Sequence, residues 1–151
     1  KISLAPASLG SIKEILVGQE QWNLNTGAFL VSEGGVHYIM ERQKLDGALF
    51  GGTGGLFVMK TQGSGKMLIS GYGDIVEIAL DGTEDFVVDN QHVLVWTESL
   101  SYSIEVASGT FGFKTGEGLV NKFRGKGKIL IQSRNVEALA KSIIPFIPSK
   151  G

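Results

Sequence analysis

The sequence contains no cysteine, only 3 prolines and no apolar run of the roughly 20 residues that a membrane-spanning helix needs. Without cysteine, disulfides, thiolate metal ligands and a cysteine nucleophile are all excluded. The charges nearly cancel, to a net −1 at pH 7, so no overall field attracts nucleic acid or an acidic membrane surface. No secretory or arginine-rich transit segment is recognisable, and the lack of cysteine is compatible with a reducing compartment.

Glycine, in contrast, is abundant: it accounts for 22 of the 151 residues, about twice the usual share. Because these glycines separate short runs of apolar and β-branched residues, they predict tight turns between many strands. We therefore expect an all-β protein with strands at residues 1–5, 11–17, 22–24, 27–31, 36–40, 56–61, 66–72, 74–80, 86–88, 92–97, 101–106, 119–123 and 128–133.

The last part of the chain has a different pattern. Val136, Leu139 and Ile143 recur at helical spacing. Asn135 is a suitable N-cap residue before them, and Pro145 ends the pattern. This segment is expected to form one short amphipathic helix that packs on the end of the β-structure.

The strongest organisational signal is an internal repeat. Turns and apolar positions of the first half recur in the second half at an offset that stays between 62 and 65 residues. We expect two copies of one β-unit, residues 1–70 and 71–133, followed by the helical segment 134–148, with all three packed as one body in a duplicated β-sandwich. The glycines assigned to structural turns are Gly63, Gly65, Gly73, Gly125 and Gly127. The matched positions are Gly10, Ile12, Glu14 and Ile15 with Gly73, Ile75, Glu77 and Ile78; Leu30 and Val31 with Leu94 and Val95; Phe50, Gly55 and Leu56 with Phe113, Gly118 and Leu119; and Gly63, Gly65, Lys66, Leu68 and Ile69 with Gly125, Gly127, Lys128, Leu130 and Ile131.

Residues 63–66, Gly-Ser-Gly-Lys, resemble the end of a phosphate-binding loop, but the rest of that motif is missing. Lys60 stands where the first glycine belongs, and Met67 replaces the metal-binding hydroxyl. A strand is expected after the motif, whereas phosphate binding needs a helix N-terminus there. These residues are therefore interpreted as a hairpin turn.

Catalytic groups are present only as scattered residues. The two histidines, His37 and His92, do not occupy equivalent positions in the two copies, and no nucleophile elbow is present. A metal-assisted hydrolase built on His92, Asp89 and Asp74 is the weakest alternative that we retain. The carboxylates of residues 74–89 could act as an acid–base pair in a cleft, but they are more simply turn caps or solvent-facing groups. We expect no enzyme, no metal and no cofactor.

A basic strip with one aromatic residue is the best charged feature. It could bind single-stranded nucleic acid through phosphate contacts and base stacking. The same lysines would also serve to protect a strand edge from pairing with another chain, which is the simpler interpretation. The residues of this strip are Lys122, Phe123, Arg124, Lys126 and Lys128.

Several glycine-containing motifs, taken in order, resemble those of the altered-inheritance-of-mitochondria protein 24 family. The resemblance implies a β-sandwich similar to the tryptophan RNA-binding attenuator protein (TRAP-like, of the double-stranded β-helix type), duplicated within the chain. Family members are usually longer, which implies a further unit before Lys1. The motifs are residues 50–57 (Phe-Gly-Gly-Thr-Gly-Gly-Leu-Phe), 63–66 (Gly-Ser-Gly-Lys), 72–75 (Tyr-Gly-Asp-Ile), 88–92 (Val-Asp-Asn-Gln-His) and 116–119 (Gly-Glu-Gly-Leu).

The resemblance transfers no catalytic residue. It implies a bacterial cytoplasmic location, with a mitochondrial location as the alternative. The preferred hypothesis is a non-enzymatic scaffold that self-associates and binds an unidentified protein partner, with no membrane span. Nucleic-acid binding through the basic strip is the second hypothesis.

Overall fold

Short strands separated by tight turns make up most of the computed structural model, which describes residues 2–42, 57–106 and 119–148. The first copy of the repeat contributes β1 (Gly10–Val17), β2 (Trp22–Asn25), β3 (Phe29–Ser32), β4 (Val36–Arg42), β5 (Phe57–Gly63) and β6 (Gly65–Tyr72). The second copy contributes β7 (Ile75–Asp81), β8 (Phe86–Asp89), β9 (Val93–Thr97), β10 (Ser101–Val106), β11 (Leu119–Arg124) and β12 (Lys126–Gln132). The helical elements are η1 (Thr26–Ala28), η2 (Asn90–His92), α1 (Val136–Ile143) and η3 (Ile144–Phe146).

One expected strand is wrong. Residues 2–5 have no regular secondary structure, and the apolar side chains of Ile2 and Leu4 are exposed. An isolated apolar run forms a strand only when a neighbouring strand satisfies its backbone groups, and none does so here within the described chain. The other expected strands form, with their ends shifted by a few residues. The glycine cluster at residues 51–55 and the matched positions Phe50, Gly55, Leu56, Phe113 and Gly118 lie outside the described residues.

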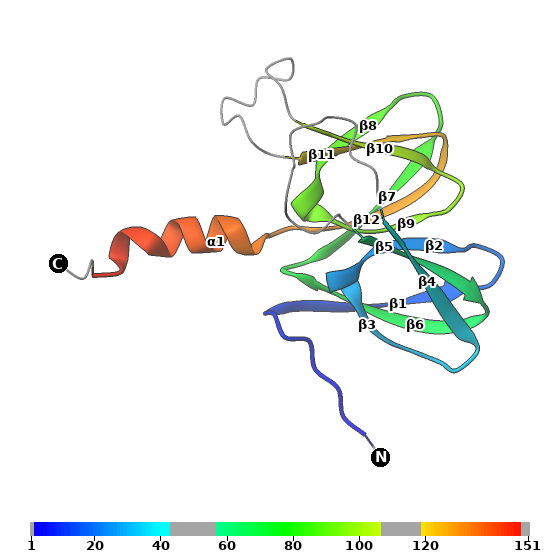
Figure 1. Ribbon diagram of the computed structural model, residues 1–151, viewed down its shortest axis with the longest axis horizontal. Coiled ribbons are helices and arrows are strands. Elements are labelled where there is room, and N and C mark those ends of the chain that lie inside the picture. The colour runs from blue at the N-terminus through cyan, green and yellow to red at the C-terminus, as the bar shows by residue number, and fades with distance from the viewer. Residues whose placement is uncertain (1, 43–56, 107–118, 149–151) are drawn as a thin grey trace.

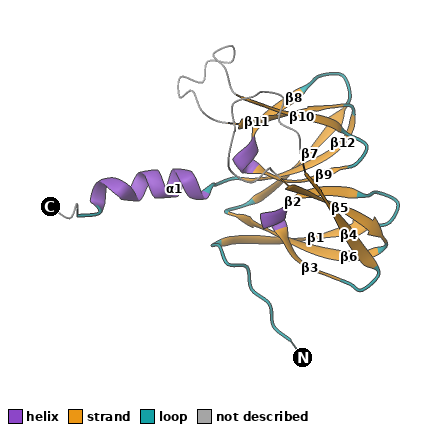
Figure 2. Ribbon diagram, in the orientation of Figure 1, coloured by secondary structure: helices purple, strands orange, loops and turns teal. Residues whose placement is uncertain are grey.

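The strands form three antiparallel sheets, whose orders are β1-β6-β3, β10-β11-β8 and β4-β5-β2-β9-β12-β7. The six-stranded sheet lies between the other two, so the molecule has three layers (Figure 1, Figure 2). One buried apolar cluster contains Trp22, Met67 and Ile69, and a second contains Trp96, Phe123 and Ile129.

The structure repeats in its strand pairing as well as in its element order. In the first copy β6 pairs with β1 and β3, and β5 pairs with β2 and β4. In the second copy β12 pairs with β7 and β9, and β11 pairs with β8 and β10. A break in strand register also recurs. The register shifts beside Val31 in the β3–β6 pair and beside Leu130, which lies opposite Val95, in the β9–β12 pair. Each copy is thus one β-unit of two small sheets.

The turn glycines follow from backbone geometry and close packing. Gly63 and Gly125, at equivalent hairpins, have φ values of 85° and 104°, in the left-handed region that residues with a side chain rarely adopt. Gly127 is required for a different reason, since a Cβ atom there would collide with the Thr97 hydroxyl. Gly65 and Gly73 also have positive φ values.

The C-terminal helix forms as expected but does not pack as expected. The Asn135 side chain accepts a hydrogen bond from the backbone N–H of Ala138 at 2.7 Å and so caps α1. All residues of α1 are exposed, and the helix projects away from the sheets (Figure 1). Its spacing predicted an apolar face but could not show what that face would contact. None of the described helices is long and apolar enough to cross a membrane.

Candidate functional site at the joint between the two β-units

The two units are joined edge to edge by β2 of the first and β9 of the second. Trp22 lies opposite Thr97, Asn23 opposite Trp96 and Leu24 opposite Val95. Two further hydrogen bonds cross the joint. The Asn25 side chain donates to the Val93 carbonyl at 2.7 Å, and the backbone N–H of Glu98 donates to the Gln21 carbonyl at 2.8 Å. The joint therefore makes one continuous six-stranded sheet from two three-stranded halves.

Apolar side chains from both units are buried beneath this joint. The first unit contributes Ile15, Trp22 and Leu24, and the second contributes Val95 and Leu130, all in one cluster. Leu24, Val95 and Leu130 are 0% exposed. Apolar burial stabilises by about 25 cal/mol per Å² and each hydrogen bond by about 0.5–1.5 kcal/mol, so the shared core and the strand pairing both hold the units together.

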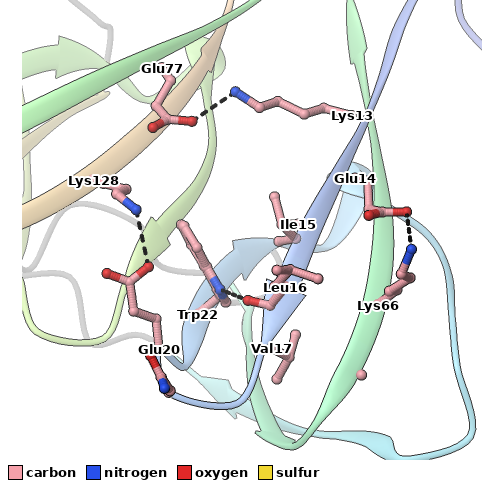
Figure 3. A pocket seen from close by; sticks show the side chains of 12 residues that line it. Lys13, Glu14, Ile15, Leu16, Val17, Glu20, Trp22, Lys66, Glu77 and Lys128 are labelled. Atoms are coloured by element: carbon pink, nitrogen blue, oxygen red, sulfur yellow. Dashed lines mark hydrogen bonds and ion pairs between the residues drawn. The ribbon is translucent and has the colours of Figure 1, made fainter.

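A cleft of about 730 Å³ opens beside the joint, between β1 and the β7–β12 edge (Figure 3). Ile15, Val17 and Trp22 provide its apolar lining, and the Trp22 indole donates to the Leu16 carbonyl at 2.9 Å. The rim of the cleft carries three ion pairs, which are Lys13–Glu77 at 2.8 Å, Lys128–Glu20 at 3.4 Å and Lys66–Glu14 at 3.3 Å. The first two pairs connect the two units, and the charges cancel pair by pair.

The Lys13–Glu77 pair has a titration consequence. The hydrogen bond from Lys13 lowers the pKa of Glu77 below its ordinary value, and the positive charges of Lys13 and Lys128 act in the same direction. A carboxyl group whose pKa is lower in the folded state stabilises the fold above its unfolded pKa. That contribution is lost as the pH falls through the folded pKa.

We expect Glu77→Gln to lower the free energy of unfolding by about 0.2–1 kcal/mol at pH 7, the range for exposed ion pairs. At an acidic pH below the lowered folded pKa of Glu77, where the wild-type carboxyl is protonated in both states, the difference should shrink towards zero. Urea unfolding of both proteins at the two pH values measures it. An equal difference at both values would show that Glu77 acts through packing and not through its charge.

Two of the three groups considered for hydrolysis, His92 and Asp89, are engaged in local structure, whereas Asp74 donates its backbone N–H to the Ser133 hydroxyl. His92 Nδ1 lies 2.7 Å from the Gln132 carbonyl, which can only accept, so Nδ1 donates. His92 Nε2 then accepts from the Asn135 amide at 3.0 Å. Asp89 accepts from the backbone N–H of Gln91 at 2.8 Å and caps η2. Within residues 2–42, 57–106 and 119–148 no group of three or more His, Asp or Glu side chains is arranged to hold a metal ion.

The basic strip does not form one surface. Lys122 and Arg124 lie on β11, whereas Lys126 and Lys128 lie on β12, which belongs to a different sheet. Phe123 is 0% exposed, because side chains alternate along a strand and its neighbours take the outward positions. It is therefore unavailable for base stacking, which corrects that part of the nucleic-acid hypothesis.

Three cations of the strip are also paired with carboxylates. Arg124 and Lys122 contact Asp85 at 3.0 Å and 3.2 Å, and the Arg124 hydrogen bond is the main cause that lowers the pKa of Asp85. Lys128 contacts Glu20, as described above. Paired cations offer less net charge to a phosphate backbone.

Comparison with known proteins assigns the family. The family model described as Mitochondrial biogenesis AIM24 matches residues 1–134. The chain belongs to the AIM24 family. An uncharacterised protein from Streptococcus pyogenes serotype M6 is 45% identical over 150 residues, which is 99% of this chain and 60% of that protein. The crystal structure of another Streptococcus pyogenes protein superimposes with a TM-score of 0.81 at 42% identity, covering 95% of this chain and 63% of that chain. This AIM24 chain thus spans less than two thirds of the length of these relatives.

The residues that line the cleft of this AIM24 chain could not be predicted from the sequence. Lys13, Glu20 and Glu77 are ordinary charged residues in alternating strands or turns, and nothing in their spacing indicates a shared rim. They meet only because β2 pairs with β9. The one usable signal was the repeat itself, which predicted that two units would share a core.

Proposed function

We propose that this chain is a non-enzymatic scaffold of the AIM24 family, which acts by binding other copies of itself and a further protein partner. The observation that carries the proposal is apolar surface left uncovered on regular elements. On β1, Ile12 and Leu16 are 46% and 65% exposed, and on α1 Val136 is 64% exposed. Apolar side chains gathered on one element favour a binding surface over a solvated one.

The chemistry of the cleft supports binding rather than catalysis. The charges at its rim are neutralised in pairs, and its lining is apolar. Among the described residues that line the cleft, none is a nucleophile with an activating base beside it. Membership of the family and the similarity to uncharacterised streptococcal proteins are compatible with this role. We propose the bacterial cytoplasm as its compartment, with cell fractionation as the test.

We expect the purified chain to elute with a mass above the 16.1 kDa of one copy, and the mass should rise with protein concentration. Size-exclusion chromatography with light scattering over a hundredfold range of concentration measures it. A mass of one copy at every concentration would argue strongly against self-association as the basis of the function.

A further inference from the structure

We infer that the contact between His92 and Asn135 makes the folding of α1 depend on pH. The helix is capped while the His92 ring is neutral, and it loses its cap when the ring gains a proton. This inference follows from the geometry of two side chains and does not depend on the scaffold function proposed above.

The Asn135 side chain makes two hydrogen bonds with opposite roles. Its Oδ1 accepts from the backbone N–H of Ala138 at 2.7 Å, the bond that caps α1. Because an N–H can only donate, that atom is the oxygen, and the amide Nδ2 is the atom that lies 3.0 Å from His92 Nε2. An amide NH2 group can only donate, so Nε2 accepts and carries no proton. One side chain thus links the helix cap to the histidine.

The other ring nitrogen shows where the single proton of the ring lies. His92 Nδ1 lies 2.7 Å from the carbonyl of Gln132, the last residue of β12, and a carbonyl can only accept. The structure therefore requires the neutral ring with its proton on Nδ1. A second proton has to bind at Nε2, where it points at the NH2 group of Asn135. Two donors cannot hydrogen-bond to each other, so protonation breaks this contact.

Protonated His92 competes with the helix for the Asn135 oxygen. A hydrogen bond from a charged donor is about twice as strong as one between neutral groups. We expect the Asn135 amide to rotate, so that Oδ1 accepts from the ring and no longer from Ala138. The first turn of α1 then has an unsatisfied N–H group in place of its cap.

The helix is short enough for its cap to decide whether it is folded. It has 8 residues, all exposed, and isolated helices of fewer than about 12 residues are marginal in water. Val136, Leu139 and Ile143 share one face only while the segment is helical, so protonation removes this apolar face. This last consequence, a pH-dependent binding surface, rests on the proposed scaffold function, whereas the loss of the cap does not.

A second contact of the helix titrates at a different pH. The side-chain amide of Gln91, beside His92, donates to the Glu137 carboxylate in the first turn of α1. A hydrogen bond from Lys141 lowers the pKa of Glu137, and the bond from Gln91 acts in the same direction. A carboxyl group with a lowered pKa stabilises the fold above its unfolded pKa, and that contribution is lost only as the pH falls through the folded pKa. This step lies below the range of about pH 5–8 in which histidine ordinarily changes charge.

The other charged groups around His92 do not bond to its ring. Among the described residues only Gln132 and Asn135 hydrogen-bond to the imidazole. Carboxylates ordinarily titrate below about pH 5, and lysine and arginine above about pH 9, so histidine is the group of this region that ordinarily titrates in between. The charged residues on the surrounding elements are Asp89 at the start of η2, Asp74 and Arg134 near the end of β12, Lys122 and Arg124 on β11, which both pair with Asp85, and Glu137 and Lys141 on α1.

NMR spectroscopy of the purified chain measures the effect. The Cα chemical shifts of residues 136–143 report how much of the segment is helical, and the ring protons of His92 report its charge. Between about pH 8 and about pH 5 the ratio of helical to unfolded segment should fall about fivefold, the usual effect of losing an N-cap. The midpoint of this step should coincide with that of the ring titration. A helical fraction that stays constant while His92 titrates would overturn the inference.

Substitutions of Asn135 separate the cap from the contact with the ring. Asn135→Ser keeps an equally preferred capping residue but removes the amide that reaches His92, so the helix should stay capped at both pH values. Asn135→Asp also keeps the cap, and its carboxylate attracts the protonated ring. In that variant the helix should again stay capped, and the midpoint of the His92 titration should rise by about one pH unit. A step that persists in the serine variant, or an unchanged midpoint in the aspartate variant, would contradict the contact.

His37→Gln is the matched control, because His37 is the other histidine of the chain and lies exposed on β4. It should keep the wild-type step. His92→Gln should remove the step, since glutamine does not titrate. If α1 unfolds on acidification equally in both variants, another group is responsible and the inference is wrong. That result would leave the scaffold function untouched, because light scattering tests self-association separately.

Discussion

Replacing Leu130 by alanine should lower the free energy of unfolding by about 2–5 kcal/mol, the usual cost of emptying a fully buried leucine site. Leu130 is 0% exposed and lies in the cluster that both units share beneath the joint. Leu130 lies opposite Val95 on β9 and Glu77 on β7, and strands paired on both sides should let the cavity close only in part. Urea unfolding monitored by tryptophan fluorescence measures the change.

Leu68 provides a control of identical chemistry at the equivalent position of the first unit. It is half-buried, because among the described residues no second unit covers it. Leu68→Ala should therefore cost about 1 kcal/mol, provided the protein is dilute enough to remain a single copy. Equal losses at the two positions would contradict the conclusion that the joint is what buries Leu130.

Trp96→Ala should be at least as damaging, at about 3–5 kcal/mol. The Trp96 ring is 0% exposed and packs against Tyr102 and Phe123, with ring centroids 4.8 Å and 5.6 Å apart. Aromatic pairs of this geometry contribute beyond their buried area. The midpoint and the slope of the urea transition together give the loss.

Trp96→Phe tests the contribution of the aromatic ring apart from that of the indole N–H. The indole Nε1 is buried and makes no hydrogen bond to the residues that the structure describes, which costs stability that a phenyl ring would not. We expect this variant to lose far less than the alanine variant, about 1 kcal/mol, because lost volume is partly offset by removal of the unpaired N–H. A loss as large as that of Trp96→Ala would show that the Nε1 atom has a partner.

The repeat allowed much of the architecture to be predicted from the sequence. Gly63 and Gly125 mark the same hairpin in each copy, and the alternating runs around them are strands. Turn chemistry and a period of two are local properties, so a single sequence reports them well. The family resemblance agreed with the matched model over residues 1–134.

The joint could not be predicted, because strand periodicity does not specify which edge pairs with which. Nothing local to Trp22 or Val95 indicates that their strands are neighbours. The same limit explains the helix: the spacing of Val136 and Leu139 predicts an apolar face but not its partner. Phe123 is different, since alternation already places it opposite Lys122 and Arg124, and its burial follows from the pattern.

A disulfide across the joint tests most directly whether β2 and β9 hold the two units together, and this chain has no cysteine to interfere. Gln21→Cys and Glu98→Cys in one chain, mildly oxidised, should form an intramolecular disulfide, because the two residues are opposed and opposed residues of antiparallel strands lie about 4.5–5.5 Å apart between Cα atoms. Gln62→Cys on β5, the strand on the far side of β2, should not replace Gln21→Cys. No intramolecular disulfide between positions 21 and 98, or an equal yield with Gln62→Cys, would contradict the joint.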